Sequence, residues 1–203
     1  MKVLTNSEVL KYFAERDPVF NGRDYAQGDE HGLYYTHPEA SCIAVEFPQE
    51  SYRLPSFARN LATLGYEPWH FSGAHLWIQN YGIWDEAVEG IGYRIIEQMN
   101  QAVGQPLAFE VSQGHNFRAD ELNEAVGMLL QPMLFAWDAF YLPRWSWGTG
   151  EFFLHISHDS YAVVVTKTIA FHEKIISNLT KLEYKLRDVP AAQVERFCQS
   201  LSH

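Results

Sequence analysis

Apolar residues follow a strand-like pattern over residues 132–166. Two apolar runs, ending at Pro143 and Ser157, lie on either side of a Gly-rich connection, and a third run follows Asp159-Ser160. Short apolar runs separated by turn-forming residues are typical of consecutive antiparallel strands. The pattern therefore predicts three such strands, which we expect at the centre of the fold.

Elsewhere the spacing of apolar residues is mostly helical. It predicts six helices, over residues 6–16, 54–64, 83–103, 120–130, 168–182 and 190–201. The first helix begins with the capping-box pattern Thr5-x-x-Glu8, and the longest is expected to end at Gly104. Pro132 is expected to end the helix over 120–130, because proline has no backbone N–H to donate.

The remaining strands are predicted in pairs. Residues 33–36 and 42–47 are interpreted as one hairpin, residues 66–81 as a second, and residues 107–111 as a single short strand. Strands grouped in this way indicate an α+β fold, with a mostly antiparallel sheet built from hairpins and packed with four to six helices. No linker rich in Pro, Ser or Gly interrupts the chain, so we expect one domain over 1–203. The alternative is two hairpin-plus-helix halves, 1–105 and 106–203.

Composition narrows the class of protein. With 203 residues, of which 47% are hydrophobic, the chain is long enough to bury a sizeable core. The N-terminus lacks a signal-peptide pattern, and no apolar run approaches the length of a membrane helix. Cys42 and Cys198 match no zinc or redox spacing, so we expect two reduced thiols in a cytoplasmic protein.

Three common catalytic motifs are absent from the sequence. There is no Gly-x-Ser-x-Gly nucleophile motif, no Gly-x-x-x-x-Gly-Lys phosphate loop and no Gly-x-Gly-x-x-Gly dinucleotide motif. We therefore expect no cofactor, and a non-enzymatic function is favoured.

Negative charge is concentrated in the middle of the chain. The formal net charge is −10, and residues 61–130 contain nine acidic and two basic residues. Four of these acids lie on the predicted helix over 83–103: Asp85, Glu86, Glu89 and Glu97. Such a section repels nucleic acid and anionic membranes and attracts a partner protein with a basic surface. The alternative is that these acids serve only solubility and the helix dipole.

The Gly-rich connection after Pro143 is a second candidate for partner binding. It reads Arg144-Trp145-Ser146-Trp147-Gly148. Exposed Trp and Arg side chains are typical of the residues that dominate protein interfaces. The alternative is that both tryptophan rings fold back onto the sheet.

The most polar part of the three-strand region offers an alternative, catalytic site. Two imidazoles and carboxylates, from Asp138, His155, His158 and Asp159, are the donors that zinc or iron sites use. Strand alternation, however, places His155 and Ser157 on one face and His158 on the other. Asp159-Ser160 also lies where a tight turn is expected, so turn formation is the favoured interpretation and no metal is expected.

Two runs in this region resemble known proteins. Trp137-Asp138-Ala139-Phe140 and Ser157-His158-Asp159-Ser160-Tyr161 resemble the C-terminal hairpin of a scattered group of small, uncharacterised bacterial proteins. In size, acidity and lack of enzyme motifs the chain is also similar to immunity proteins that neutralise polymorphic toxins. The leading hypothesis is therefore a bacterial, cytoplasmic protein-binding protein of the immunity or inhibitor type. The alternative is a metal-dependent hydrolase that uses the His/Asp cluster.

Overall fold

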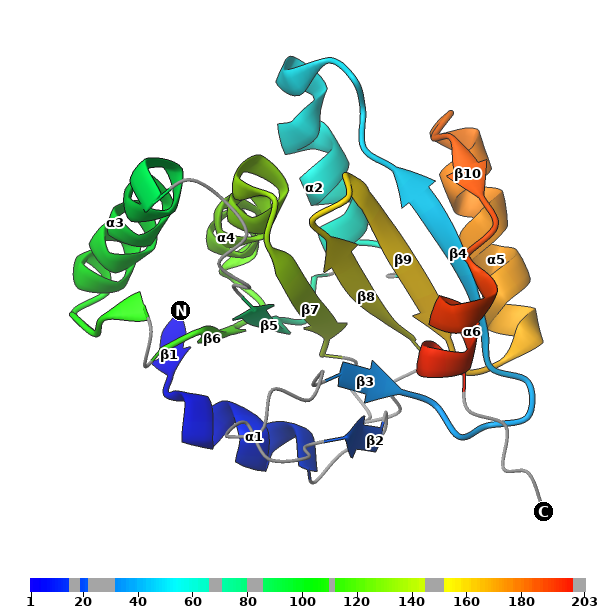
Figure 1. Ribbon diagram of the computed structural model, residues 1–203, viewed down its shortest axis with the longest axis horizontal. Coiled ribbons are helices and arrows are strands. Elements are labelled where there is room, and N and C mark those ends of the chain that lie inside the picture. Colours follow the sequence, from blue (N-terminus) through cyan, green and yellow to red (C-terminus); the bar gives the residue numbers. More distant parts are fainter. Residues whose placement is uncertain are drawn as a thin grey trace.

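Strands from both halves of the chain join in one antiparallel sheet at the centre of the molecule (Figure 1). The computed structural model describes residues 1–14, 19–21, 32–65, 71–79, 86–109, 112–144 and 152–198. Within these residues the sheet has eight strands, in the order β1 (Lys2–Leu4), β6 (Gly114–Phe117), β5 (Ala74–Gln79), β7 (Asp138–Pro143), β8 (Phe152–Ser157), β9 (Tyr161–Thr166), β4 (Ser41–Glu46) and β10 (Leu186–Arg187). Two further strands, β2 (Val19–Asn21) and β3 (Gly32–Tyr34), pair with each other in a separate small sheet.

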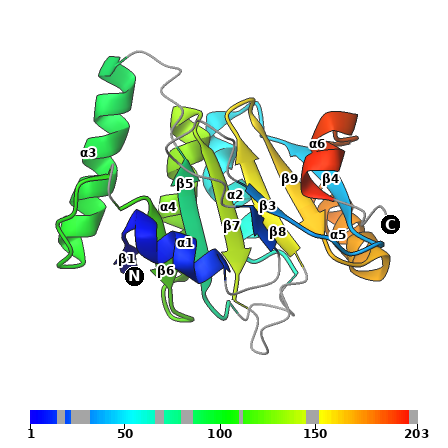
Figure 2. The same cartoon turned by 60° about the horizontal axis from the view of Figure 1, so that its bottom comes forward.

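Helices cover both faces of the sheet. They are α1 (Asn6–Ala14), α2 (Leu54–Ala62), α3 (Glu86–Ala102), α4 (Leu122–Phe135), α5 (Ile169–Lys181) and α6 (Ala191–Phe197). One face packs against α2, α4 and α5, and the other against α1, α6 and β3, while α3 lies beside α4 (Figures 1 and 2). Six helices around an antiparallel sheet confirm the α+β fold within the described residues. In the same residues, none of the helices combines the length and apolar character needed to span a membrane.

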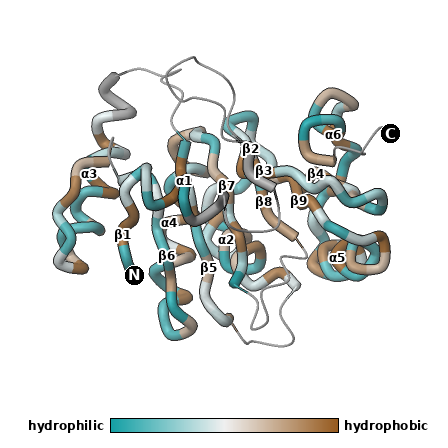
Figure 3. The backbone as a smooth tube through the Cα atoms, turned by 90° about the horizontal axis from the view of Figure 1, so that it is seen from below, coloured by the Kyte–Doolittle hydropathy of each residue, from teal (hydrophilic) through white to brown (hydrophobic). Residues whose placement is uncertain are grey.

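The three consecutive strands predicted from the apolar pattern are confirmed as β7, β8 and β9. Every residue of the three strands is buried. Phe140 lies opposite His155, and His155 lies opposite Val163, so the register of the meander is continuous. In Figure 3 the hydrophobic colour covers much of β8 and β9. These strands are therefore covered by other elements on both faces of the sheet.

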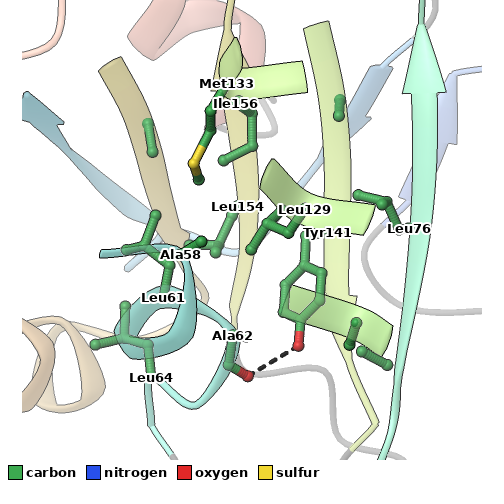
Figure 4. Packing of buried hydrophobic residues seen from close by; sticks show 14 of the residues in the cluster. Ala58, Leu61, Ala62, Leu64, Leu76, Leu129, Met133, Tyr141, Leu154 and Ile156 are labelled. Atoms are coloured by element: carbon green, nitrogen blue, oxygen red, sulfur yellow. Dashed lines mark hydrogen bonds between the residues drawn. The ribbon is translucent and has the colours of Figure 1, made fainter. Parts of the chain in front are cut away.

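Strand alternation divides the buried residues into two clusters. On β7, Ala139 and Tyr141 face α2 and α4, whereas Phe140 and Leu142 face the α6 side. Figure 4 shows the first cluster, in which the Tyr141 hydroxyl donates a hydrogen bond of 2.8 Å to the backbone oxygen of Ala62. Each large apolar side chain buried in this way contributes about 1.5–3 kcal/mol of stability.

Both predicted hairpins are corrected by the sheet order. β3 pairs with β2, and β4 pairs with β9 on one side and β10 on the other, so residues 33–36 and 42–47 are not hairpin partners. β5 likewise pairs with β6 and β7, which both come later in the chain. Residues 66–70 of the second predicted hairpin lie outside the described residues. Short-range turn signals identified these strands but not their partners.

The prediction of a strand over 107–111 is also wrong for residues 107–109, which are the part of this range that the structure describes. Residues 107–109 are not extended in a sheet, and the strand is β6, which begins at Gly114. A Cβ atom at Gly114 would lie 1.9 Å from Cγ2 of Val9. Glycine is required there because α1 packs directly on the strand.

Helix α4 continues past Pro132 to Phe135, so the prediction that Pro132 ends it is wrong. A proline within a helix removes one hydrogen bond, but Met128, Leu129 and Met133 continue the buried face of the helix on both sides of Pro132. The helix ends instead at Ala136, which has a left-handed φ of 50°, and Trp137 N donates to Pro132 O at 3.0 Å. The first of the three strands consequently begins at Asp138 rather than at 132.

The predicted start of α1 and the predicted end of α3 are confirmed. Thr5 N donates to Oε2 of Glu8 at 2.8 Å, and Glu8 N donates back to Oγ1 of Thr5 at 3.3 Å, which is a capping box. This hydrogen bond from the Thr5 backbone lowers the pKa of Glu8. At the other end of the longest helix, Gly104 has a φ of +75° and follows the last helical turn.

Candidate functional site

The polar cluster predicted around the three strands lies where β7 begins and β8 ends. Asp138 is the first residue of β7, and alternation places it on the same face as Phe140. Because Phe140 lies opposite His155, both Asp138 and His155 face the side of the sheet that α6 covers. Gln79, at the end of β5, lies directly opposite Asp138 on the other side. The sheet register therefore assembles these polar groups from three strands.

Asp138 is the centre of this cluster. Its Oδ1 atom accepts a hydrogen bond of 2.9 Å from the backbone N–H of His158 and lies 3.1 Å from Nδ1 of the His158 ring. The carboxylate is almost buried, whereas His158 is about one-third exposed. The prediction that His158 points to the opposite face from His155 is wrong. β8 ends at Ser157, so His158 belongs to the turn and its ring returns towards Asp138.

The turn between β8 and β9 uses the other predicted residues. Asp159 N donates to Oγ of Ser157 at 3.2 Å, and Ser160 has a left-handed φ of 64°. Short polar side chains that bond nearby backbone groups are typical of tight turns. Oδ1 of Asp159 also lies 3.6 Å from Nε2 of His158, and the Asp159 side chain is largely exposed. The His158 imidazole thus lies between two carboxylates, one buried and one in solvent.

His155 is buried in an aromatic environment. Its ring centroid lies 5.0 Å from that of Phe140 and 5.2 Å from that of Phe197. Burial, reinforced by the charge of Arg196, lowers its pKa to about 3, so the imidazole is neutral at neutral pH. Neither ring nitrogen has a hydrogen-bond partner among the described residues, since Oδ1 of Asp138 is 3.8 Å from Nε2. His155 is accordingly a packed core residue whose two ring nitrogens are buried.

The C-terminal elements β10 and α6 bring polar residues to this cluster that the sequence did not indicate. Nε2 of Gln193 donates a hydrogen bond of 2.6 Å to the Tyr161 hydroxyl, and the Arg187 guanidinium lies 4.2 Å from the centre of the Tyr161 ring. These residues are distant in sequence from Asp138, and no local motif links them to it. The only sequence signal was the appearance of polar residues within otherwise apolar strands.

The cluster differs from a typical metal centre. Within the described part of the chain, no group of three or more His, Cys, Asp or Glu side chains is arranged to hold a metal ion. The arrangement instead orients the imidazole of His158. A carboxylate that accepts a hydrogen bond from Nδ1 fixes the tautomer of the ring and leaves Nε2 available. An Asp–His pair of this kind serves either as a structural clamp or as a general base.

The predicted partner-binding residues are distributed over two places. Asp85, Trp145 and Trp147 lie outside the described residues, and Glu86 and Glu89 are placed only as positions in the first turn of α3. Glu97 is half-buried on α3, and its Oε1 accepts from Phe109 N at 3.3 Å. The half-buried Arg144 donates from Nη2 to Oδ1 of Asn116 at 3.0 Å. Both charged groups therefore contact their own chain.

An exposed groove lies beside Glu97. It has a volume of about 450 Å³ and is lined by Arg94, Glu97, Gln98, Gln101 and residues 106–108. On the same exposed face of α3, one turn before Arg94, lies Ile91, which is 55% exposed, and across the groove Leu107 is 37% exposed. Figure 2 shows that α3 lies to one side of the sheet, beside α4.

The two candidate regions thus differ in chemistry. The Asp138 cluster is polar and largely closed, whereas the α3 groove is open and combines apolar with charged side chains. Comparison of the chain with protein-family models, with curated proteins and with solved structures finds no match.

Proposed function

We propose that the protein binds a partner protein through the groove between α3 and residues 106–108, acting in the cytoplasm as an immunity or inhibitor protein. The observation that carries this proposal is the pair of exposed apolar side chains, Ile91 and Leu107, beside a groove of about 450 Å³. Apolar side chains surrounded by a polar rim are typical of sites where proteins bind each other. Residues 106–108 supply the apolar wall of the groove, and polar side chains of α3, among them Arg94 and Glu97, supply the opposite wall.

Charge favours a basic partner. The net charge is −10, and residues 61–130, which include α3 and the groove, contain nine acidic and two basic residues. Some of these acids are already paired within the chain, because Glu121 binds the N-terminal amine and Arg118. The remaining excess accelerates encounter with a basic surface, and apolar contacts in the groove slow dissociation. This combination suits an inhibitor of a basic toxin or nuclease domain.

A matched pair of truncations tests the proposal. Ile91→Ala removes an apolar contact at the groove, and Ile169→Ala removes an equally exposed isoleucine on α5, far from it. Proteins captured from the native lysate by the wild-type chain are identified and purified, and their affinities for both variants are measured. We expect Ile91→Ala, alone or with Leu107→Ala, to weaken binding about tenfold or more, which is the loss typical of an interface hot spot. Ile169→Ala is expected to bind like the wild type.

Salt and activity measurements complete the test. The association rate with the captured partner is expected to fall as ionic strength rises. If the chain is an immunity or inhibitor protein, the enzymatic or toxic activity of the partner is also expected to be abolished when an equimolar amount of the wild-type chain is added. A partner that binds both isoleucine variants equally, or whose association rate is indifferent to salt, contradicts the proposed groove.

One observation favours an alternative, a metal-dependent hydrolase that uses Asp138, His155, His158 and Asp159. Oδ1 of Asp138 lies 3.1 Å from one imidazole and 3.8 Å from the other. In such an enzyme a bound ion lowers the pKa of a water molecule and generates the nucleophile. Elemental analysis of protein purified without a histidine tag separates the two proposals. The partner-binding proposal expects no stoichiometric zinc or iron, whereas zinc that disappears in His158→Ala supports the hydrolase.

A further inference from the structure

The fold brings together the two cysteines of the chain, Cys42 and Cys198. Cys42 lies on β4 opposite Val165, on the face of the sheet that α6 covers, and Cys198 follows the last residue of α6. Both are half-buried and pack against the apolar cluster that contains Phe153 and Phe197. Residues from opposite ends of the sequence therefore meet on one surface of the sheet.

The two thiols lie against the same apolar cluster and interact with each other. Both are free, and the Cys42 thiol donates a hydrogen bond to the Cys198 sulfur. This hydrogen bond lowers the pKa of Cys198, and the same contact together with burial raises the pKa of Cys42. The pair is therefore asymmetric, with Cys198 the better nucleophile of the two.

The backbone holds Cys198 in place. Cys198 N donates to Val194 O at 2.8 Å, Tyr35 N donates to Phe197 O at 2.9 Å, and Tyr35 and Cys198 form a parallel β-bridge. Cys42 is fixed in turn by the β4–β9 ladder. Two thiols that separate elements hold next to each other are placed to become covalently linked.

We propose that Cys42 and Cys198 form a reversible disulfide by exchange with a small-molecule disulfide such as oxidised glutathione. The Cys198 thiolate attacks one sulfur of oxidised glutathione, whose S–S bond breaks and releases one glutathione thiolate, which takes up a proton. The Cys42 thiol loses its proton to solvent and attacks the Cys198 sulfur of the mixed disulfide, releasing the second glutathione. Two protein thiols are thereby oxidised, and one oxidised glutathione is reduced to two thiols.

The disulfide fastens the C-terminal helix to the sheet. Helix α6 places Phe197 over His155 and Gln193 against Tyr161, so it closes the polar cluster described above. With Cys42 linked to Cys198, this cover opens only when the rest of the sheet unfolds. The oxidation state of the cell then sets how readily α6 detaches.

The test uses the full wild-type chain in buffers of defined reduced-to-oxidised glutathione ratio. After acid quenching and alkylation, mass spectrometry of the intact chain and of its peptides reports the fate of each cysteine. We expect an intramolecular Cys42–Cys198 bond in oxidising buffer, reversed by reduction, and a melting temperature raised by about 5–10 °C in the oxidised chain. Both thiols remaining free, or disulfides only between chains, overturns the proposal.

Single variants test the order of the two steps. Cys42→Ser is expected to stop at the mixed disulfide, with glutathione retained on Cys198. Cys198→Ser is expected to take up glutathione on Cys42 much more slowly, because the thiolate is less populated there. Equal rates of uptake by the two variants contradict the assignment of Cys198 as the attacking thiol. Melting curves of the reduced variants confirm that both remain folded.

Discussion

Asp138 shows how one buried carboxylate connects two strand ends. It accepts from the backbone N–H of His158 and contacts the ring of the same residue, so the β8–β9 turn is held against the start of β7. Burying a polar group without a hydrogen-bond partner destabilises the folded chain by more than the hydrogen bond itself stabilises it. The Asp138 carboxylate and the His158 N–H therefore each need the other as a partner. Asp138 therefore has a structural role whether or not it also has a chemical one.

Replacing Asp138 by alanine is expected to destabilise the chain by about 1–3 kcal/mol, because the His158 N–H loses its acceptor. The control is Asp159→Ala, in the same turn, where an exposed carboxylate is removed and the change is expected to stay within about 0.5 kcal/mol. Urea unfolding of both variants measures the difference. Equal destabilisation by the two substitutions contradicts a structural role for the contact between Asp138 and His158.

The buried histidines predict a loss of stability in acid. Burial lowers the pKa of both His115 and His155 to about 3, against an ordinary value of about 6.5. Between these values the unfolded chain binds the protons that the folded chain excludes, so the free energy of unfolding falls as the pH falls. Each histidine contributes a slope of about 1.4 kcal/mol per pH unit within that window, and above pH 6.5 its contribution is constant.

Substituting His155 by leucine removes the contribution of this histidine to the pH dependence of the free energy of unfolding. We expect urea unfolding between pH 6.5 and pH 4 to show a shallower pH dependence of the free energy of unfolding in His155→Leu than in the wild type. A wild-type slope in His155→Leu shows that this imidazole is accessible to protons in the folded state.

At the scale of elements, α3 is positioned by its contact with a tryptophan. A Cβ atom at Gly92 would lie 2.5 Å from Cη2 of Trp137, whose ring is enclosed by Phe109 and Phe135. The ring has no room to move away. Gly92 therefore allows α3 to approach Trp137 at the end of α4.

Two alanine substitutions in the same helix test this contact. Gly92→Ala is expected to cost about 1–3 kcal/mol through overpacking. Gly90→Ala, where nothing lies within 4 Å of the new Cβ, is expected to stabilise the chain by about 0.5–1 kcal/mol, because alanine is the better helix former. Thermal or urea unfolding gives both values. Stabilisation by both substitutions shows that α3 shifts freely on Trp137.

Elements marked by local chemistry were predictable from the sequence. The capping box at Thr5, the glycine after α3 and the turn between β8 and β9 are each determined by residues close in sequence. Predictions failed where a distant contact decided the structure. Gly114 belongs to a strand because α1 packs on it, and α4 passes Pro132 because its buried face continues.

The candidate site divides in the same way. Asp138, His155, His158 and Asp159 were grouped in the sequence as one possible polar site, and the structure brings Asp138 into contact with His158. The contribution of α6 and the meeting of Cys42 with Cys198 depend on how the C-terminal segment docks on the sheet. Sequence spacing contains no information on that docking.

At the scale of the whole molecule, the described strands are interleaved. Before residue 105 the main sheet contains only β1, β4 and β5 among the described residues, and each of them pairs exclusively with strands from after residue 105. The N-terminal half thus provides no strand pair for the main sheet by itself. Such long-range pairing requires most of the chain to be present before the sheet forms.

A fragment containing residues 1–105 is therefore expected to remain unfolded. Circular dichroism and amide chemical-shift dispersion measure this directly. Mixing it with residues 106–203 is expected to restore strand signal, because the missing neighbours of β1, β4 and β5 are then supplied. A cooperative melt of the 1–105 fragment alone contradicts this and supports two independent halves.

The two borders of the described sheet end in strands of three and two residues, β1 and β10. A long, flat border would offer a row of unpaired backbone groups to a second molecule, and short strands with charged residues such as Lys2 and Arg187 do not. The Val- and Phe-rich interior of the sheet is thereby kept from acting as a template for fibril growth. We therefore expect the chain to resist amyloid-type polymerisation because of how the sheet ends, independently of what the protein binds.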